Sequence, residues 1–188
     1  MPRLFDLIES YLRGESVRKA AVFTPEELMQ FWKEASSTNT FWLVRKIASS
    51  LAYLGGNRLA ELRQAKQSAI SRCAEGYLFK FVPAKQRGHV RESSFLIPRG
   101  NAPNGVCFAS MMDTYLEILE TIGLRSSDPE KNKHRPFLYT GRADTASGTS
   151  KFYNSPIGEN TLRKIGQDIA NWLGLENADK YTGHTFRR

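Results

Sequence analysis

Four basic side chains in this sequence have the types and spacing that chemistry on a phosphate group requires. Arg58 lies just inside a predicted helix start, in the stretch Gly-Gly-Asn-Arg-Leu-Ala-Glu-Leu, and Lys85 lies at the predicted tip of a hairpin. His184 and Arg187 are three positions apart, so on one helical turn both can face the same ligand. Two guanidiniums can hold the non-bridging oxygens of a phosphodiester, while an imidazole shares a proton and a lysine donates one to a leaving oxygen. These are the electrostatic components of phosphoryl transfer without a metal.

Each of these residues has a plainer interpretation when it is taken alone. Arg58 at a helix surface can pair with Glu61, three residues further on, and Lys85 in a turn can simply be solvated. His184 is equally compatible with a helix cap or a core position. Only the combination of all four, in this order, favours a shared site.

The common motifs for other chemistry are missing from the sequence. It has no Gly-x-Gly-x-x-Gly or Gly-x-x-x-x-Gly-Lys-Ser/Thr loop to cradle a nucleotide phosphate, and no Gly-x-Ser-x-Gly elbow. The histidines His89, His134 and His184 are far apart and accompany no Cys-x-x-Cys or His-Glu-x-x-His pattern. The sequence therefore predicts neither a cofactor nor a metal.

The charge balance favours a polyanionic partner. The chain has 188 residues, with 27 Lys and Arg against 19 Asp and Glu, a net charge of +8 and a pI near 9.6. Each phosphate that such a surface neutralises releases condensed counterions. The cations occur singly or in pairs such as Arg45-Lys46, which predicts a folded cationic surface rather than a basic tail.

Composition and length indicate one globular domain. Hydrophobic residues make up 40% of the chain and aromatic residues 11%, enough for a core. Cys73 and Cys107 form no paired motif, as in proteins of reducing compartments. No secretory signal opens the sequence, and no apolar run approaches the roughly 18 residues of a membrane span. We therefore expect an intracellular protein that does not associate with membranes, in the nucleus of a eukaryote or in the cytoplasm and nucleoid of a bacterium.

The spacing of hydrophobic residues predicts the elements that must position these groups. Helices are expected at about 4–12, from Thr24-Pro25-Glu26-Glu27 onwards, and at 40–55, 57–66, 106–122, 158–173 and the start of 182–188. Alternation predicts a hairpin of strands 77–82 and 94–97 with a basic tip at 85–88. We expect 126–136 to form a polar loop, 136–139 an extended segment, and the Gly-, Ser- and Thr-rich stretch 140–156 a mobile loop. The predicted fold class is α+β, mainly α, with a small antiparallel sheet.

The first of these stretches resembles the first conserved box of the tyrosine recombinases, the phage-integrase-like family. That box has a glycine shortly before an arginine, followed by an acid and a leucine, and Gly56, Arg58, Glu61 and Leu62 match it. The lysine on the family's β-hairpin corresponds to Lys85, which also lies between two predicted strands.

The end of the sequence resembles the second box of the same family, His-x-x-Arg, at His184 and Arg187. The pattern Thr-Gly-His-Thr-x-Arg is particularly similar to recombinases of the Cre, DIRS and Crypton kinds. The resemblance covers roughly residues 23–188, with the hairpin early and helices between the two boxes, as in the family.

The resemblance implies a protein that binds double-stranded DNA, and that cuts and rejoins it by transesterification without metal or nucleotide. Arg58 and Arg187 would bind the scissile phosphate, and His184 would assist proton transfer. Lys85 would protonate the 5′-oxygen leaving group, and Glu61 would support the first box. A homo-oligomer on DNA is the assembly that the resemblance implies, and further DNA contacts are expected from Arg87, Arg91 and Arg188.

The sequence also departs from the family pattern. The family's third box and its nucleophilic tyrosine come after the second box, whereas Tyr181, the last of the seven tyrosines here, precedes His184. We therefore expect an amino-terminal arm at 1–22 and a partial catalytic domain at 23–188 that binds DNA weakly and does not cleave it. Two alternatives remain open: a domesticated, non-catalytic DNA-binding protein, and a helical protein-interaction module.

Overall fold

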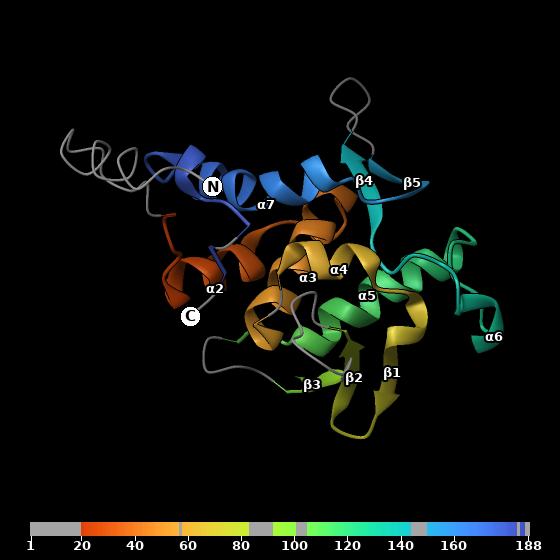
Figure 1. Ribbon diagram of the computed structural model, residues 1–188. Helices are drawn as coiled ribbons and strands as arrows, with labels where there is room; N and C mark the ends of the chain where they lie inside the picture. The colour runs from red at the N-terminus through yellow and green to blue at the C-terminus, as the bar shows by residue number, and fades with distance from the viewer. Residues whose placement is uncertain are drawn as a thin grey trace, which may run out of the picture.

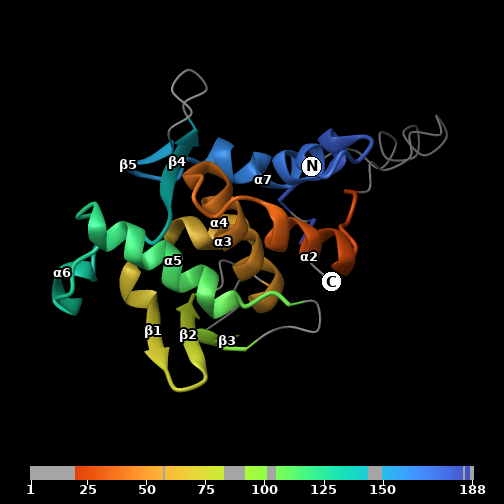
Figure 2. The ribbon, with the colours of Figure 1, turned by 180° about the vertical axis from the view of Figure 1, so that it is seen from behind.

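The computed structural model describes residues 20–56, 58–82, 92–100, 105–143, 150–183 and 185–186. Helix α3 (Thr40–Gly55) lies at the centre, with α7 (Glu159–Trp172) along one side of it and α5 (Phe108–Thr121) on the other (Figures 1 and 2). A three-stranded sheet lies at the end of the molecule opposite α7. The predicted class, α+β and mainly α with a small antiparallel sheet, is confirmed.

Helix α2 (Pro25–Glu34) begins at the predicted capping box. The Thr24 hydroxyl accepts the Glu27 N–H at 3.2 Å, and the Glu27 carboxylate accepts the Thr24 N–H at 2.7 Å. The apolar side of the helix is buried, through Leu28, Phe31 and Trp32.

Helix α3 follows the predicted bounds and forms the middle of the core. The Asn39 side chain caps its first turn, and the helix ends at Gly56, whose φ of 61° is the left-handed conformation that favours glycine. Residues on every face of α3 are buried, as expected of a helix that is packed on all sides.

The predicted hairpin is part of a larger sheet. Strands β2 (Gly76–Phe81) and β3 (Ser93–Pro98) pair antiparallel, with Tyr77 opposite Ile97. A strand that the sequence did not predict, β1 (Ile70–Cys73), pairs with the other edge of β2. β1 was missed because it is short and polar, and only Ile70 of its four residues is buried. The basic tip at 85–88 lies outside the described residues.

Helix α5 confirms the helical period predicted for 106–122, with Phe108, Met111 and Tyr115 buried. The polar loop expected at 126–136 contains one short helix, α6 (Pro129–Asn132), whose first turn is capped by the Asp128 carboxylate.

The prediction of a mobile loop at 140–156 is wrong for the described residues of that segment. Strands β4 (Tyr139–Ala143) and β5 (Ser150–Pro156) form an antiparallel ladder there. The strand β4 needs a small residue at Gly141, because it packs closely on α3. A Cβ at Gly141 would lie 2.2 Å from the Thr40 carbonyl oxygen. The other strand, β5, packs on α5 through Phe152, whose buried ring lies 5.6 Å from that of Tyr115.

Helix α7 forms within the range predicted, 158–173. It buries Leu162, Ile165 and Ile169, and Trp172 is half-buried. After α7 the chain forms a short 3₁₀ turn, η2 (Ala178–Lys180). The helix expected to start at 182–188 is not formed by its described residues, 182–183 and 185–186, and the rest of that segment lies outside them. The helix predicted at 4–12 and most of the arm 1–22 also lie outside the described residues.

Among the described residues, none of the helices combines the length and apolar character that a membrane crossing needs. The same part of the chain contains no group of three or more His, Cys, Asp or Glu side chains placed to hold a metal ion.

Candidate functional site

A pocket of about 460 Å³ opens between the first turns of α7, the start of helix α4 (Leu59–Gln64) and the segment that follows η2. It joins residues that are far apart in the sequence, because Arg58 lies on one wall and Thr182 and Gly183 lie on another. The full lining consists of Arg58, Leu59, Glu159, Leu162, Arg163, Thr182 and Gly183. The pocket thus brings part of the first box next to the two residues that directly precede His184.

Arg58 reaches the pocket because of the turn between α3 and α4. Gly56 ends α3 in the left-handed conformation, and Arg58 then takes the extended conformation of a helix N-cap. Its backbone N–H donates to the Glu61 carboxylate at 2.8 Å, which fixes the main chain at the start of α4. This contact engages the main chain of Arg58, a half-buried residue that lines the pocket.

Glu61 therefore holds the start of α4 through the backbone N–H of Arg58. The hydrogen bond joins the Arg58 backbone N–H to the Glu61 carboxylate, so it differs from the side-chain ion pair that the spacing of these two residues suggested. A carboxylate in the first turn of α4 also complements the partial positive charge of the helix start.

A second acid joins the two helices that border the pocket. Glu159, the first residue of α7, pairs with Arg63 of α4 at 3.3 Å and with Arg163 of its own helix at 2.5 Å. The charged residues of the lining are Arg58, Arg163 and Glu159, so the lining itself has one more positive than negative charge. No sequence pattern predicted these pairs, because Arg63 and Glu159 meet only through the packing of α4 on α7.

The segment before His184 is held against α7 by a close backbone contact. A Cβ at Gly166 would lie 2.7 Å from the Tyr181 carbonyl oxygen and 3.1 Å from that of Thr182. Only a glycine at this position of α7 lets the segment approach so closely. The approach places Thr182 and Gly183 at the pocket.

The other side of this segment packs on the stretch that precedes α2. The Phe23 ring lies 4.5 Å from that of Tyr181 and 5.6 Å from that of Phe186, and both Phe23 and Phe186 are buried. The Ala21 N–H donates to the Lys180 carbonyl at 3.0 Å. The segment is therefore fixed both by α7 and by the chain that enters α2.

The remaining predicted site residues lie outside the described residues. These are Lys85, Arg87, Arg91, His184, Arg187 and Arg188. Of the predicted site, the structure places Arg58 in the pocket and Glu61 behind it, and it brings Thr182 and Gly183 alongside.

The charge pattern predicted that the pair Arg45-Lys46 belongs to a cationic surface. This prediction is wrong, because both residues are buried. Arg45 is buried and donates from Nε to Asp168 at 2.8 Å, which ties α3 to α7. Lys46 is 2% exposed, and its Nζ donates to the Ala35 carbonyl at 2.7 Å and to the Ser37 hydroxyl at 3.0 Å. Burial lowers the pKa of Lys46 to about 8.

A second group of charged residues lies around Asp113 on α5. Its carboxylate accepts the Tyr77 hydroxyl at 2.5 Å and the Arg99 guanidinium at 3.1 Å. Burial by itself would raise the pKa of Asp113, but the hydrogen bonds from Arg99 and Tyr77 bring it below its usual value. Burial and the bond to Asp113 raise the pKa of Tyr77 to about 12. This group fastens the three-stranded sheet to α5.

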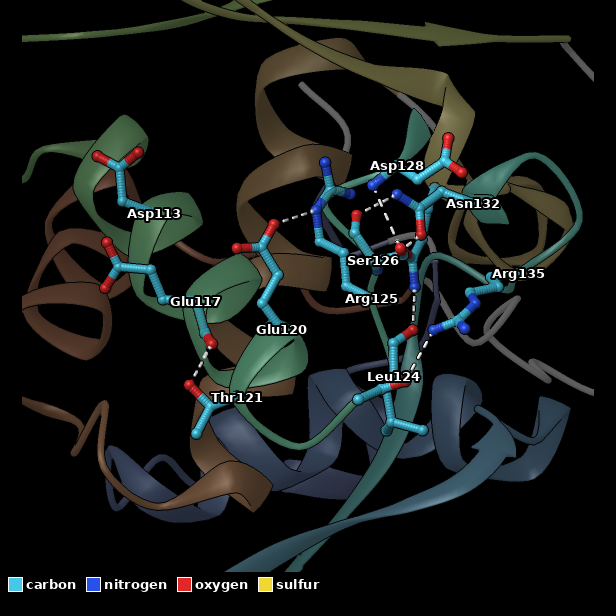
Figure 3. Close-up of polar contacts among 12 residues, drawn as sticks. Asp113, Glu117, Glu120, Thr121, Leu124, Arg125, Ser126, Asp128, Asn132 and Arg135 are labelled. Atoms are coloured by element: carbon cyan, nitrogen blue, oxygen red, sulfur yellow. Dashed lines mark hydrogen bonds and ion pairs between the residues drawn. The ribbon is translucent and has the colours of Figure 1, made fainter. Parts of the chain in front are cut away.

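Beyond Asp113, the connection from α5 to α6 is held by a polar network (Figure 3). Arg125 pairs with Glu120 at 3.1 Å, and the side chain of Asn132 exchanges two hydrogen bonds with the main chain of Ser126. Two hollows of about 260 and 390 Å³ border Arg125. The cations here are matched by acids, so this region has less excess charge than the pocket at Arg58.

Comparisons by sequence found no matching protein-family model and no matching curated protein. Comparisons by structure found the site-specific recombinase XerH in two crystal structures, a post-cleavage complex with a palindromic difH substrate and a pre-cleavage complex with a difH substrate. Both share 15% sequence identity with this chain and cover 90% of it, with TM-scores of 0.54 and 0.53. The match takes up 40% and 41% of the XerH chains, so this chain spans less than half of their length. At this identity the likeness concerns the fold, and the fold agrees with the one that the sequence motifs implied.

Proposed function

We propose that these residues form part of a site-specific recombinase of the tyrosine recombinase family, and that they bind double-stranded DNA at the pocket beside Arg58. The observation that carries the proposal is the pocket itself. It joins Arg58 of the first box to Thr182 and Gly183, the two residues directly before the second box, although nothing but the fold brings them together. The fold shared with XerH and the net charge of +8 support the same conclusion.

In this proposal Arg58 and Arg187 hold the scissile phosphate, and their guanidiniums stabilise the charge that develops as the phosphorus is attacked. His184 shares a proton with the reacting oxygens, and Lys85 gives a proton to the 5′-oxygen that leaves. The whole protein would cut and rejoin DNA by transesterification, so the energy of the broken bond is kept in the new one. The subgroup nearest to Cre, DIRS and Crypton recombinases is proposed from the second box alone.

We further propose that residues 1–188 bind DNA without cleaving it. All seven tyrosines precede the second box, whereas the family places its nucleophile after that box. Incubation with a nicked suicide substrate should give no covalent protein–DNA adduct on a denaturing gel. An adduct would show that one of these seven tyrosines, or another side chain, acts as nucleophile.

The binding proposal is tested by fluorescence anisotropy with a labelled duplex over a series of salt concentrations. The logarithm of the binding constant should fall linearly with the logarithm of the salt concentration, because phosphate contacts release counterions. The Arg58→Ala and Arg187→Ala variants should each bind at least about fivefold more weakly, as expected when a charged hydrogen bond of 1–3 kcal/mol is lost.

Lys131→Ala is the matched control, since it also removes one positive charge but lies on exposed α6, which does not line the pocket. Equal losses in Lys131→Ala and Arg58→Ala would mean that net charge rather than the pocket governs binding. Absence of salt-dependent binding by the parent protein would favour the alternative of a protein-interaction module.

A further inference from the structure

The exposed face of the ladder formed by β4 and β5 carries an unusual arrangement of cations. Arg142 and Lys151 are direct cross-strand partners in the antiparallel register. Gly141 and Phe152, the pair beside them, face the core, so alternation turns Arg142 and Lys151 toward solvent. Like charges placed directly opposite each other weaken a strand pair.

The same aromatic ring lies near both of these cations. The Tyr153 ring is 5.1 Å from the Arg142 guanidinium carbon and 5.4 Å from the Lys151 Nζ, and the residue is 38% exposed. Contact with the ring face keeps both cations together without neutralising either. Among the described residues, no acid forms an ion pair with Arg142 or Lys151.

The backbone beneath this face is held firmly. The Thr40 hydroxyl donates to the carbonyls of Arg142 and Lys151, and the Thr40 N–H donates to the Ser150 hydroxyl at 3.0 Å. Both strands are therefore fixed to the start of α3, and the two cations project from a rigid base. Two cations on a fixed base, with no described acid paired to either, are suited to an anion with more than one charge.

We infer that Arg142, Lys151 and Tyr153 form a second contact with the DNA backbone, separate from the pocket at Arg58. The inference rests on the proposed function, because it takes the polyanion to be the same duplex. β5 leads directly into α7, whose first turns border the pocket. Eight residues separate Lys151 from Glu159, which lines the pocket, so at about 3.3 Å per residue the two are at most about 26 Å apart. At 3.4 Å per base pair, this second contact falls within about eight base pairs of the pocket wall at Glu159.

The inference is tested with the double variant Arg142→Gln/Lys151→Gln in the same anisotropy titration. Loss of two phosphate contacts should reduce the salt slope by about 1.8, since each contact contributes about 0.9 on B-form DNA. The control is Lys131→Gln/Lys133→Gln, at the end of α6 and directly after it. It makes the same change in net charge and should leave the slope within about 0.3 of the parent. An unchanged slope in the first variant, or an equal drop in both, overturns the inference.

Two further measurements separate this inference from the proposed function. Ethylation interference should show two groups of phosphates. The group that Arg142→Gln/Lys151→Gln no longer requires should be displaced by up to about eight base pairs from the group that Arg58→Ala no longer requires. A photocrosslinker in place of Tyr153 should also label the flanking DNA. If the parent protein binds no DNA, the proposed function fails; if it binds and only Arg58→Ala weakens it, the second contact alone is refuted.

Discussion

Lys46 is a buried amine whose two hydrogen-bond partners are neutral oxygens. Because the folded state lowers its pKa from 10.5 to about 8, the unfolded chain binds more protons than the folded one between these values. The free energy of unfolding should therefore rise as the pH increases from about 8 toward 10. Tyr77, with its pKa raised to about 12, has the opposite effect only above about pH 10.

Urea denaturation between pH 7.5 and 9.5 measures this effect. We expect the stability to increase by about 2 kcal/mol over this range, at 1.36 kcal/mol per pH unit above the lowered pKa. Lys46→Met keeps the length of the side chain and removes the titrating group, so its stability should vary much less with pH. A parallel rise in both proteins would assign the pH dependence to other groups.

At the scale of the element, the approach of α7 to the segment before His184 depends on Gly166. Alanine normally favours a helix over glycine by about 1 kcal/mol. Here an added Cβ meets the backbone of Tyr181 at 2.7 Å, which cannot move like a flexible side chain. We expect Gly166→Ala to lower the stability by about 1–3 kcal/mol, as overpacking does, and to weaken DNA binding by displacing Thr182 and Gly183.

Gly158→Ser, at the N-cap of the same helix, is the control for this prediction. A Cβ there meets only the Thr161 hydroxyl at 3.8 Å, and serine is a good cap, so stability and binding should be kept or improved. Binding must be compared at a temperature where all variants are folded. Parent-like stability and affinity in Gly166→Ala would show that the segment can be displaced without consequence.

At the scale of the whole molecule, the features best predicted from the sequence are those that depend on residues close together in the chain. The capping box at Thr24, the end of α3 at Gly56 and the position of Arg58 at a helix start all depend on residues within a few positions of each other. The β4–β5 ladder was missed because small residues that indicate a loop are also what a strand needs when it packs against a helix backbone.

The pocket could be predicted only in part, for the same reason. The motifs named Arg58, but the ion pairs of Glu159 and the contact of Phe23 with Tyr181 join segments from distant parts of the chain. Arg45-Lys46 also misled the charge argument, because a pair of cations in the sequence does not show whether helix packing buries them.

The hydrogen bond from the Ala21 N–H to the Lys180 carbonyl offers a built-in reporter of the pocket wall. This amide can exchange with deuterium only when its hydrogen bond to Lys180 breaks, which also loosens the residues that lead to the second box. A duplex that holds the pocket closed should therefore slow exchange at Ala21, an amide that does not line the pocket. Hydrogen exchange measured with and without DNA would then follow pocket closure from a distance. Equal rates would show that the wall opens independently of the ligand.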